Sequence, residues 1–179
     1  MLTLVIGGAR SGKSRFAASL CSPESNVTFI ATARPSDSEM QSRIERHRRE
    51  RSPRWTTVEE PLSMAAAVAR CVTTSDIVLV DCLTLWLSNL SWERRLAPFD
   101  DLEQEACSEI AEVARASVQG HVILVTNEVG CGVTPVTELG RSFQDLQGFT
   151  NQHAARAADV VYHITAGIPV RIKDRRNDP

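Results

Sequence analysis

The sequence predicts an α/β fold in which a mainly parallel central sheet is flanked by helices and ends in a C-terminal β-hairpin. Short apolar runs of strand length alternate with helix-length amphipathic segments along most of the chain. Several of these runs are continuously apolar, which is typical of strands that are buried on both faces. The 179 residues contain no linker-like segment, so residues 1–179 are expected to form a single domain.

The composition is that of an ordinary globular protein and argues against several classes of protein. Hydrophobic residues make up 42% and charged residues 23%, and a net charge of −2 disfavours a general nucleic-acid-binding protein. No apolar run reaches the roughly 18 residues of a membrane span, and Met1 leads into a strand rather than a signal peptide. The five cysteines form no C-x-x-C pair, which favours a reducing compartment. We therefore expect a cytoplasmic protein without a membrane span.

The expected strands are runs of apolar and β-branched residues, at 2–6, 27–31, 55–59, 77–80, 122–125, 159–164 and 168–172. The last two form the hairpin, which turns around Gly167. Helices are expected at 13–21, 36–52, 61–72 and 100–119, and after Pro135. The apolar segment 82–90 is expected to be helical or irregular, with Trp86 buried.

Local signals predict where several helices begin and which way they face. Residues 36–39 have the form of a capping box, with Ser36 as the N-cap. Pro61 suits the first position of the next helix, and Asp100 or Asp101 is expected to cap the long helix that follows. The helix after Pro135 is expected to turn three apolar side chains inward, Leu139, Phe143 and Leu146.

The first strand runs directly into a phosphate-binding sequence. Residues 7–14 read G-x-x-x-x-G-K-S and comprise Gly7, Gly8, Ala9, Arg10, Ser11, Gly12, Lys13 and Ser14. The glycines let the backbone wrap a phosphate, and the helix start adds unpaired N–H groups. Lys13 can bridge the β- and γ-phosphates, and the Ser14 hydroxyl can bind Mg²⁺. The flanking strand and helix signals argue against an accidental glycine-rich turn, so we expect a P-loop NTPase fold that binds a nucleoside triphosphate.

Other candidate site residues follow strands, because ligands of open parallel sheets sit beyond the carboxyl ends of the strands. Asp81 ends an apolar run, where a Walker-B carboxylate holds Mg²⁺; the alternative is a carboxylate that caps the next segment. Asn127 and Glu128 end a later strand. They could position substrate or water, or belong to a solvated loop.

His47 lies in the arginine-rich helix expected at 36–52, on a stripe with Met40 and Ile44. From this spacing alone, a half-buried structural histidine is the more ordinary interpretation. The surrounding arginines are either a solvated face or a phosphate-binding lid, since guanidinium groups match phosphate oxygens.

Motif blocks in a fixed order run through the whole chain and carry a resemblance to a known family. The blocks are residues 7–14, 30–33, Met40 with Arg43, Ile44 and His47, then 55–61, 80–87, 125–130, Gly132, Val133, Pro135, Asn151, Gln152, Ala158, Asp159 and Gly167. In these blocks the chain resembles the bifunctional adenosylcobinamide kinase / adenosylcobinamide-phosphate guanylyltransferase family of cobalamin biosynthesis. The P-loop alone is shared by many families, whereas its combination with His47 and the T-N-E-V-G block is specific.

The resemblance implies roles for individual residues. It makes His47 the nucleophile that takes GMP from GTP as a covalent intermediate and passes it to adenosylcobinamide phosphate. Glu59 matches a carboxylate that contacts guanosine, and Asp81 matches one near the nucleotide and the metal. A nucleotide-contacting loop is matched by Ala31, Thr32, Ala33 and Arg34. The run beside His47 would bind the nucleotide and offset charge on its triphosphate, and it comprises Arg48, Arg49, Glu50 and Arg51. Some family members carry two adjacent histidines, whereas here Arg46 precedes His47 and leaves one candidate.

The resemblance also implies substrates, a cofactor and an assembly. The P-loop would use ATP or GTP with Mg²⁺ to phosphorylate the aminopropanol hydroxyl of adenosylcobinamide, and the protein would be a homotrimer. Two other functions stay open from the residues alone. One is a simple P-loop kinase of a nucleoside or small metabolite, with a structural His47; the other is a nucleotide-dependent switch or assembly ATPase.

Overall fold

The computed structural model describes residues 1–35 and 38–175, apart from the side chains of Glu39, Arg43 and Glu50. Its centre is a seven-stranded sheet in the order β3-β2-β4-β5-β1-β6-β7. The strands are β1 (Leu2–Gly7), β2 (Val27–Ala31), β3 (Thr56–Glu59), β4 (Ile77–Asp81), β5 (His121–Asn127), β6 (Val160–Thr165) and β7 (Ile168–Asp174). All neighbouring strands pair in parallel except β6 and β7, which form an antiparallel hairpin. The α/β fold, the mainly parallel sheet and the C-terminal hairpin are confirmed.

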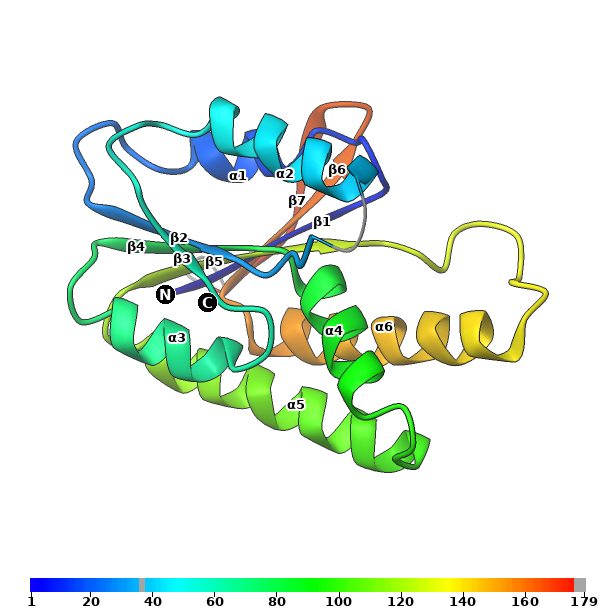
Figure 1. The fold of residues 1–179 in the computed structure, drawn as a ribbon. Helices are drawn as coiled ribbons and strands as arrows, with labels where there is room; N and C mark the ends of the chain where they lie inside the picture. The colour runs from blue at the N-terminus through cyan, green and yellow to red at the C-terminus, as the bar shows by residue number, and fades with distance from the viewer. Residues whose placement is uncertain (36–37, 176–179) are drawn as a thin grey trace.

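Helices cover both faces of the sheet (Figure 1). They are α1 (Lys13–Ser19), α2 (Ser38–Glu50), α3 (Met64–Cys71), α4 (Leu83–Glu93), α5 (Phe99–Ala116) and α6 (Glu138–Ala157). Figure 1 shows α1 and α2 on one face, and α3, α4, α5 and α6 on the other. Among the described helices, none is both long enough and apolar enough to cross a lipid bilayer.

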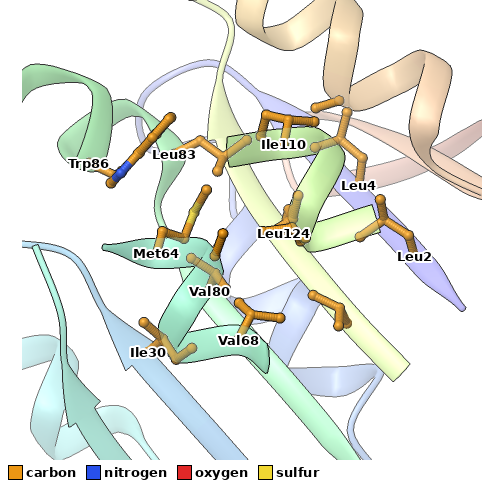
Figure 2. Packing of buried hydrophobic residues seen from close by; sticks show 14 of the residues in the cluster. Leu2, Leu4, Ile30, Met64, Val68, Val80, Leu83, Trp86, Ile110 and Leu124 are labelled. Atoms are coloured by element: carbon orange, nitrogen blue, oxygen red, sulfur yellow. The ribbon is translucent and has the colours of Figure 1, made fainter. Parts of the chain in front are cut away.

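Alternating side chains of the central strands pack into two hydrophobic cores, one on each face of the sheet. Leu124 of β5 points into the larger core, among α3, α4, α5 and α6, whereas its neighbours Ile123 and Val125 point into the smaller core under α1. Figure 2 shows the larger core, in which Met64 and Leu83 pack near Trp86. Because the central strands are buried on both faces, their sequences are continuously apolar, which is why they were recognisable.

Three local expectations about the helices are wrong. Helix α5 begins at Phe99, with Pro98 as its N-cap. Asp100 and Asp101 therefore lie in the first turn, where their negative charges stabilise the helix by interacting with the positive end of its dipole. Because Phe99 packs against the larger core, the helix begins at this residue, earlier than the aspartates suggest. Leu139 is 79% exposed because it lies in the first turn of α6, beside the loop, while Phe143 and Leu146 further along pack as expected.

Helix α3 begins later than Pro61 suggests. Its N-cap is Ser63, and the carboxylate of Glu60 accepts the N–H groups of Leu62 and Ser63 at 3.1 and 2.9 Å, so a turn precedes the helix. The capping box expected at 36–39 includes residues outside the described part of the chain. Segment 82–90 is helical, and Trp86 is fully buried, as expected.

Replacing Trp86 by alanine is expected to lower the free energy of unfolding by about 3–5 kcal/mol, as for other large-to-small changes in a packed core. The side chain is fully buried, and its indole N–H donates to the Leu62 carbonyl at 2.7 Å. Trp92 of the same helix is 68% exposed, so Trp92→Ala should change stability by less than about 0.5 kcal/mol. Urea denaturation measures both. An equal loss of unfolding free energy in the two variants would contradict the prediction that Trp86 is buried in the core and Trp92 is not.

Candidate active site

The P-loop connects β1 to α1 and has a backbone that only glycine suits at two points. Gly12 is the N-cap of α1 and has a φ of +93°, a left-handed conformation that glycine adopts without strain. Gly7 has no room for a side chain, because a Cβ there would lie 2.6 Å from the Ile164 carbonyl oxygen and 2.7 Å from Ser11 Oγ. The geometry expected from the glycine spacing is therefore present.

The hairpin β6–β7 supports this loop from the side. The N–H of Gly167, in the hairpin turn, donates to the Ser11 carbonyl at 2.8 Å. A Cβ on Gly12 would lie 3.4 Å from the Gly167 Cα, so the turn and the loop are in close contact. The C-terminal hairpin thus takes part in fixing the phosphate-binding loop.

Lys13 is held inside the loop as a buried cation. Its ammonium donates to the Gly8 carbonyl at 3.1 Å, and the residue is only 8% exposed. Burial lowers the pKa of Lys13, while the nearby Asp81 carboxylate acts in the opposite direction. A positive charge beside unpaired N–H groups of a helix start favours binding of a polyphosphate.

Parallel pairing brings the carboxyl ends of four strands to one edge of the sheet. Asp81 of β4 pairs in register with Ala31 of β2 and with Val125 of β5, and Gly7 of β1 pairs with Asn127. The P-loop, the Asp81 carboxylate and the end of β5 therefore meet at the same edge, as the sequence predicted.

A cleft of about 830 Å³ opens at this edge, between the P-loop and α2. Its lining includes the predicted site residues Ala9, Arg10, Lys13, Ser14, Ala31, Ala33, His47, Arg48, Arg51, Glu59 and Asp81. Asn127 and Glu128 also line it, which favours a role in positioning substrate over a merely solvated loop. The volume lies within the range of small-ligand sites.

Helix α2 forms one wall of the cleft and is attached to the rest of the protein through its arginines. Arg48 makes an ion pair with Glu59 of β3 at 2.6 Å. The Arg51 guanidinium, just after α2, stacks over the Phe29 ring at 3.6 Å from its centroid. Burial lowers the pKa of Arg51, and Asp81 is the first of the charges that oppose this shift. With Arg46, three guanidinium groups thus line the α2 side of the cleft.

His47 is exposed, so the half-buried position expected from its helix stripe is wrong. Helix α2 lies over a cleft instead of a core, and Met40 and Ile44 on the same stripe are only half-buried and also line the cleft. The three other histidines lie where expected, His121 in β5, His163 in β6 and His153 in α6. Of the four, His47 is the one that lines the cleft.

Several predicted nucleotide contacts lie beside the cleft rather than on its lining. Thr32 is fully buried, and its hydroxyl donates to the Cys82 carbonyl at 2.8 Å and accepts from the Cys82 N–H at 2.9 Å, which ties β2 to β4. Arg34 makes an ion pair with Glu93 at 2.6 Å. Arg49 is exposed and outside the lining, and the Glu50 side chain lies outside the described atoms. The remaining P-loop residues, Gly7, Gly8, Ser11 and Gly12, form the loop backbone without lining the cleft.

The structure adds cleft residues that sequence reasoning missed, above all Phe29, Leu85 and Cys82. Phe29 is only 5% exposed, and the Arg51 guanidinium covers its ring, so Phe29 supports this arginine at the edge of the cleft. The available signal was strand alternation, since Phe29 faces the same side of the sheet as Ala31. Leu85 and Cys82 belong to the motif block 80–87, but the resemblance implied no role for either residue.

A buried polar network holds the end of β5 against α6. The Thr126 hydroxyl donates to the Asn151 side-chain oxygen at 2.7 Å, and Gln147 donates to the same oxygen at 2.9 Å. The Asn151 amide in turn donates to the Asn127 carbonyl at 3.0 Å. This network positions Asn127, and with it Glu128, at the cleft.

Comparisons with known proteins show which proteins this chain is similar to. The family model described as "Cobinamide kinase / cobinamide phosphate guanyltransferase" (CobU) matches residues 3–172. Among solved structures, the P4 protein from bacteriophage phi6 in complex with ADP aligns with a TM-score of 0.44 at 11% identity, covering 94% of this chain and 53% of that chain.

The curated relatives are similar over nearly their whole length. The bifunctional adenosylcobalamin biosynthesis protein CobP of Pseudomonas aeruginosa is 42% identical, covering 97% of this chain and 98% of that protein. The bifunctional adenosylcobalamin biosynthesis proteins CobU of Escherichia coli and Salmonella typhimurium are 38% and 37% identical, each covering 97% of this chain and 100% of the relative. The chain therefore belongs to the cobinamide kinase / cobinamide phosphate guanyltransferase family.

Proposed function

We propose that the protein phosphorylates adenosylcobinamide with ATP or GTP and then transfers GMP from GTP to adenosylcobinamide phosphate. The observation that carries the proposal is that one cleft is lined both by P-loop residues and by His47 with its neighbouring arginines. A simple kinase needs only the first of these groups. Family membership and the names of the relatives support both reactions.

For the kinase reaction, the P-loop and Lys13 hold the β- and γ-phosphates of the donor. The substrate hydroxyl oxygen attacks the γ-phosphorus, the bond from that phosphorus to the bridging oxygen breaks, and the nucleoside diphosphate leaves. Lys13 stabilises the charge that develops on the phosphate oxygens. Glu128, at the same cleft, is our candidate to accept the hydroxyl proton.

Mg²⁺ is the cofactor that we propose for both reactions, with Ser14 and Asp81 as the residues that hold it. Both side chains line the cleft, and the Asp81 carboxylate is near enough to Lys13 to affect its pKa. A hydroxyl and a carboxylate are the hard oxygen donors that Mg²⁺ prefers, so the residues present fit the ion. When bound, Mg²⁺ offsets charge on the phosphate oxygens.

For the guanylyl transfer, a neutral imidazole nitrogen of His47 attacks the α-phosphorus of GTP. A nitrogen–phosphorus bond forms, the bond from the α-phosphorus to the bridging oxygen breaks, and pyrophosphate leaves. A phosphate oxygen of adenosylcobinamide phosphate then attacks the same phosphorus and releases His47. Arg48 and Arg51, which line the cleft, would offset the charge on the triphosphate.

We assign the guanine contact to Glu59. Its carboxylate lines the cleft at the end of β3 and accepts a hydrogen bond from Arg48 at 2.6 Å. A carboxylate suits a purine base that presents neighbouring N–H donors. Binding of GTP would then compete with the Arg48 ion pair and couple α2 to the nucleotide.

Product analysis tests the function. The protein is incubated with adenosylcobinamide, ATP, GTP and Mg²⁺, and the corrinoid products are separated and identified by mass. We expect adenosylcobinamide phosphate first, followed by adenosylcobinamide-GDP with release of pyrophosphate. Phosphate product without the GDP product, when GTP is present, would favour the simple kinase. No phosphorylated corrinoid at all would contradict the proposal.

We also propose a cytoplasmic homotrimer. The free thiols of all five cysteines fit a reducing compartment. For the assembly, β7 is an edge strand whose alternate side chains Ile168, Val170 and Ile172 are 66, 50 and 62% exposed. An apolar edge strand of this kind favours contact with another subunit.

Light scattering tests the trimer. We expect a mass of about three times the 19.7 kDa of the chain. The double change Ile168→Lys and Ile172→Lys should dissociate the assembly, because it places charge on the apolar edge. The change Val118→Lys, at an 85% exposed position after α5, is the control and should leave the mass unchanged. A wild-type mass of 19.7 kDa would contradict the proposal.

A further inference from the structure

A second group of chemically reactive side chains lies away from the nucleotide cleft. Glu103 and Cys107 of α5 and His153 of α6 each direct one potential ligand atom to the same point, and these atoms all lie within 4.8 Å of one another. All three residues are partly buried. None of them lines the cleft, and α5 and α6 cover the face of the sheet opposite α1 and α2 (Figure 1).

The packing of α5 against α6 brings these residues together. Phe99 of α5 and Phe149 of α6 contact edge to face, with ring centroids 6.4 Å apart. One helical turn further along each helix come Glu103 and His153, and Cys107 follows Glu103 by another turn on the same face. The aromatic contact thus fixes the register in which the two helices present the three ligand atoms.

The charge of the cluster suits a cation. The Glu103 carboxylate lies within 4.8 Å of the Cys107 sulfur and the His153 ring nitrogen, and its negative charge attracts a positive ion to that point. Within the described part of the chain, no other residue hydrogen-bonds the three ligand side chains. Their donor atoms are therefore available to an ion.

We propose that Glu103, Cys107 and His153 form a binding site for a divalent transition-metal ion of the Zn²⁺ type. Sulfur, imidazole nitrogen and carboxylate oxygen together are the donor set of zinc sites, whereas Mg²⁺ prefers oxygen alone. Zinc–ligand bonds of about 2.0–2.3 Å need the three atoms somewhat closer together than 4.8 Å, so the proposal includes a small side-chain adjustment on binding. Three protein ligands leave a fourth position for water.

Cobalt(II) absorption tests the site directly, because Co²⁺ takes the place of Zn²⁺ and its thiolate complexes absorb strongly. The full-length protein is stripped of metal with a chelator, reduced, and titrated with Co²⁺. We expect a thiolate-to-cobalt band that saturates at one equivalent per chain and is lost when Zn²⁺ is added.

Variants show whether the Co²⁺ band comes from this cluster or from another cysteine of the chain. Cys107→Ser should remove the band, and His153→Gln and Glu103→Gln should weaken Co²⁺ binding on the order of 100-fold. Cys131, exposed in the loop before α6, is the matched control, and Cys131→Ser should leave the titration unchanged. Thermal melts without metal establish that each variant is folded.

Two results would overturn the proposal. They are the absence of a thiolate band at one equivalent, and a band that persists in folded Cys107→Ser. Because the readout is optical and needs neither GTP nor corrinoid, it is independent of the two proposed enzymatic reactions.

Discussion

The change His47→Ala is expected to abolish covalent labelling of the protein by GTP that carries a labelled α-phosphate. The wild-type protein, incubated with this GTP and Mg²⁺ and then denatured, should retain a label that is labile in acid and stable in alkali, as for a phosphoramidate. His47 is the cleft-lining histidine of the described chain, so its loss removes the nitrogen nucleophile. The second reaction, GMP transfer, should fall to background with it.

The kinase reaction provides an internal control for this variant. Phosphoryl transfer uses the P-loop rather than His47, so His47→Ala should keep most of its kinase activity. The matched variant is His163→Ala, in β6, where the imidazole lies 3.2 Å from the Thr165 hydroxyl and outside the cleft lining. It should label like the wild type. Label that survives in His47→Ala, or no label on the wild-type protein, would disprove the assignment of the nucleophile.

The change Lys13→Ala is expected to lower the kinase rate constant by on the order of 10²–10³-fold, the usual cost of removing one group that stabilises transition-state charge. Lys13 is the buried cation of the P-loop, and no other lysine is near, since Lys173 is at the opposite end of β7 from the hairpin turn. Steady-state assays with saturating ATP measure the effect. A rate within a few-fold of the wild type would mean that the P-loop does not act on the transferred phosphate.

Two further measurements make the Lys13 experiment specific. Lys173→Ala removes an ammonium group that donates to the Ala155 carbonyl at 2.6 Å, far from the phosphates, and should keep the kinase rate. Burial lowers the pKa of Lys13, so the nucleotide-free protein loses this charge at a lower pH than an exposed lysine would. GTP affinity should therefore decline as the pH rises into the alkaline range, and Lys13→Ala should remove that pH dependence.

The P-loop and the strand order show which parts of a site are encoded locally. Loop conformation at Gly12 follows from the absence of a side chain, and the positions of Lys13 and Ser14 follow from the loop and helix start. Asp81 was predictable because it ends a continuously apolar strand, and parallel strands end at one edge. These inferences need only the identity of neighbouring residues and the spacing of apolar residues along a strand or helix. Both can be taken directly from the sequence.

Helix α2 is a part of the site that the spacing of its residues did not predict. Its stripe of Met40, Ile44 and His47 has the same spacing as a stripe that packs on a core, yet it faces a cleft and His47 is exposed. Periodicity reports which residues share a face, but not what lies opposite that face. The resemblance to a known family, rather than the pattern, predicted His47 as a site residue, and the structure shows that it lines the cleft.

By itself, then, the sequence determined the α/β class, the phosphate-binding loop and the carboxylate at the end of β4, because each follows from local backbone chemistry or strand periodicity. The tertiary structure alone decided that Leu139 is exposed, that Phe29 lines the cleft, and that Cys107 meets His153. These facts depend on how helices pack against partners that are distant in the chain, and no local signal carries that information.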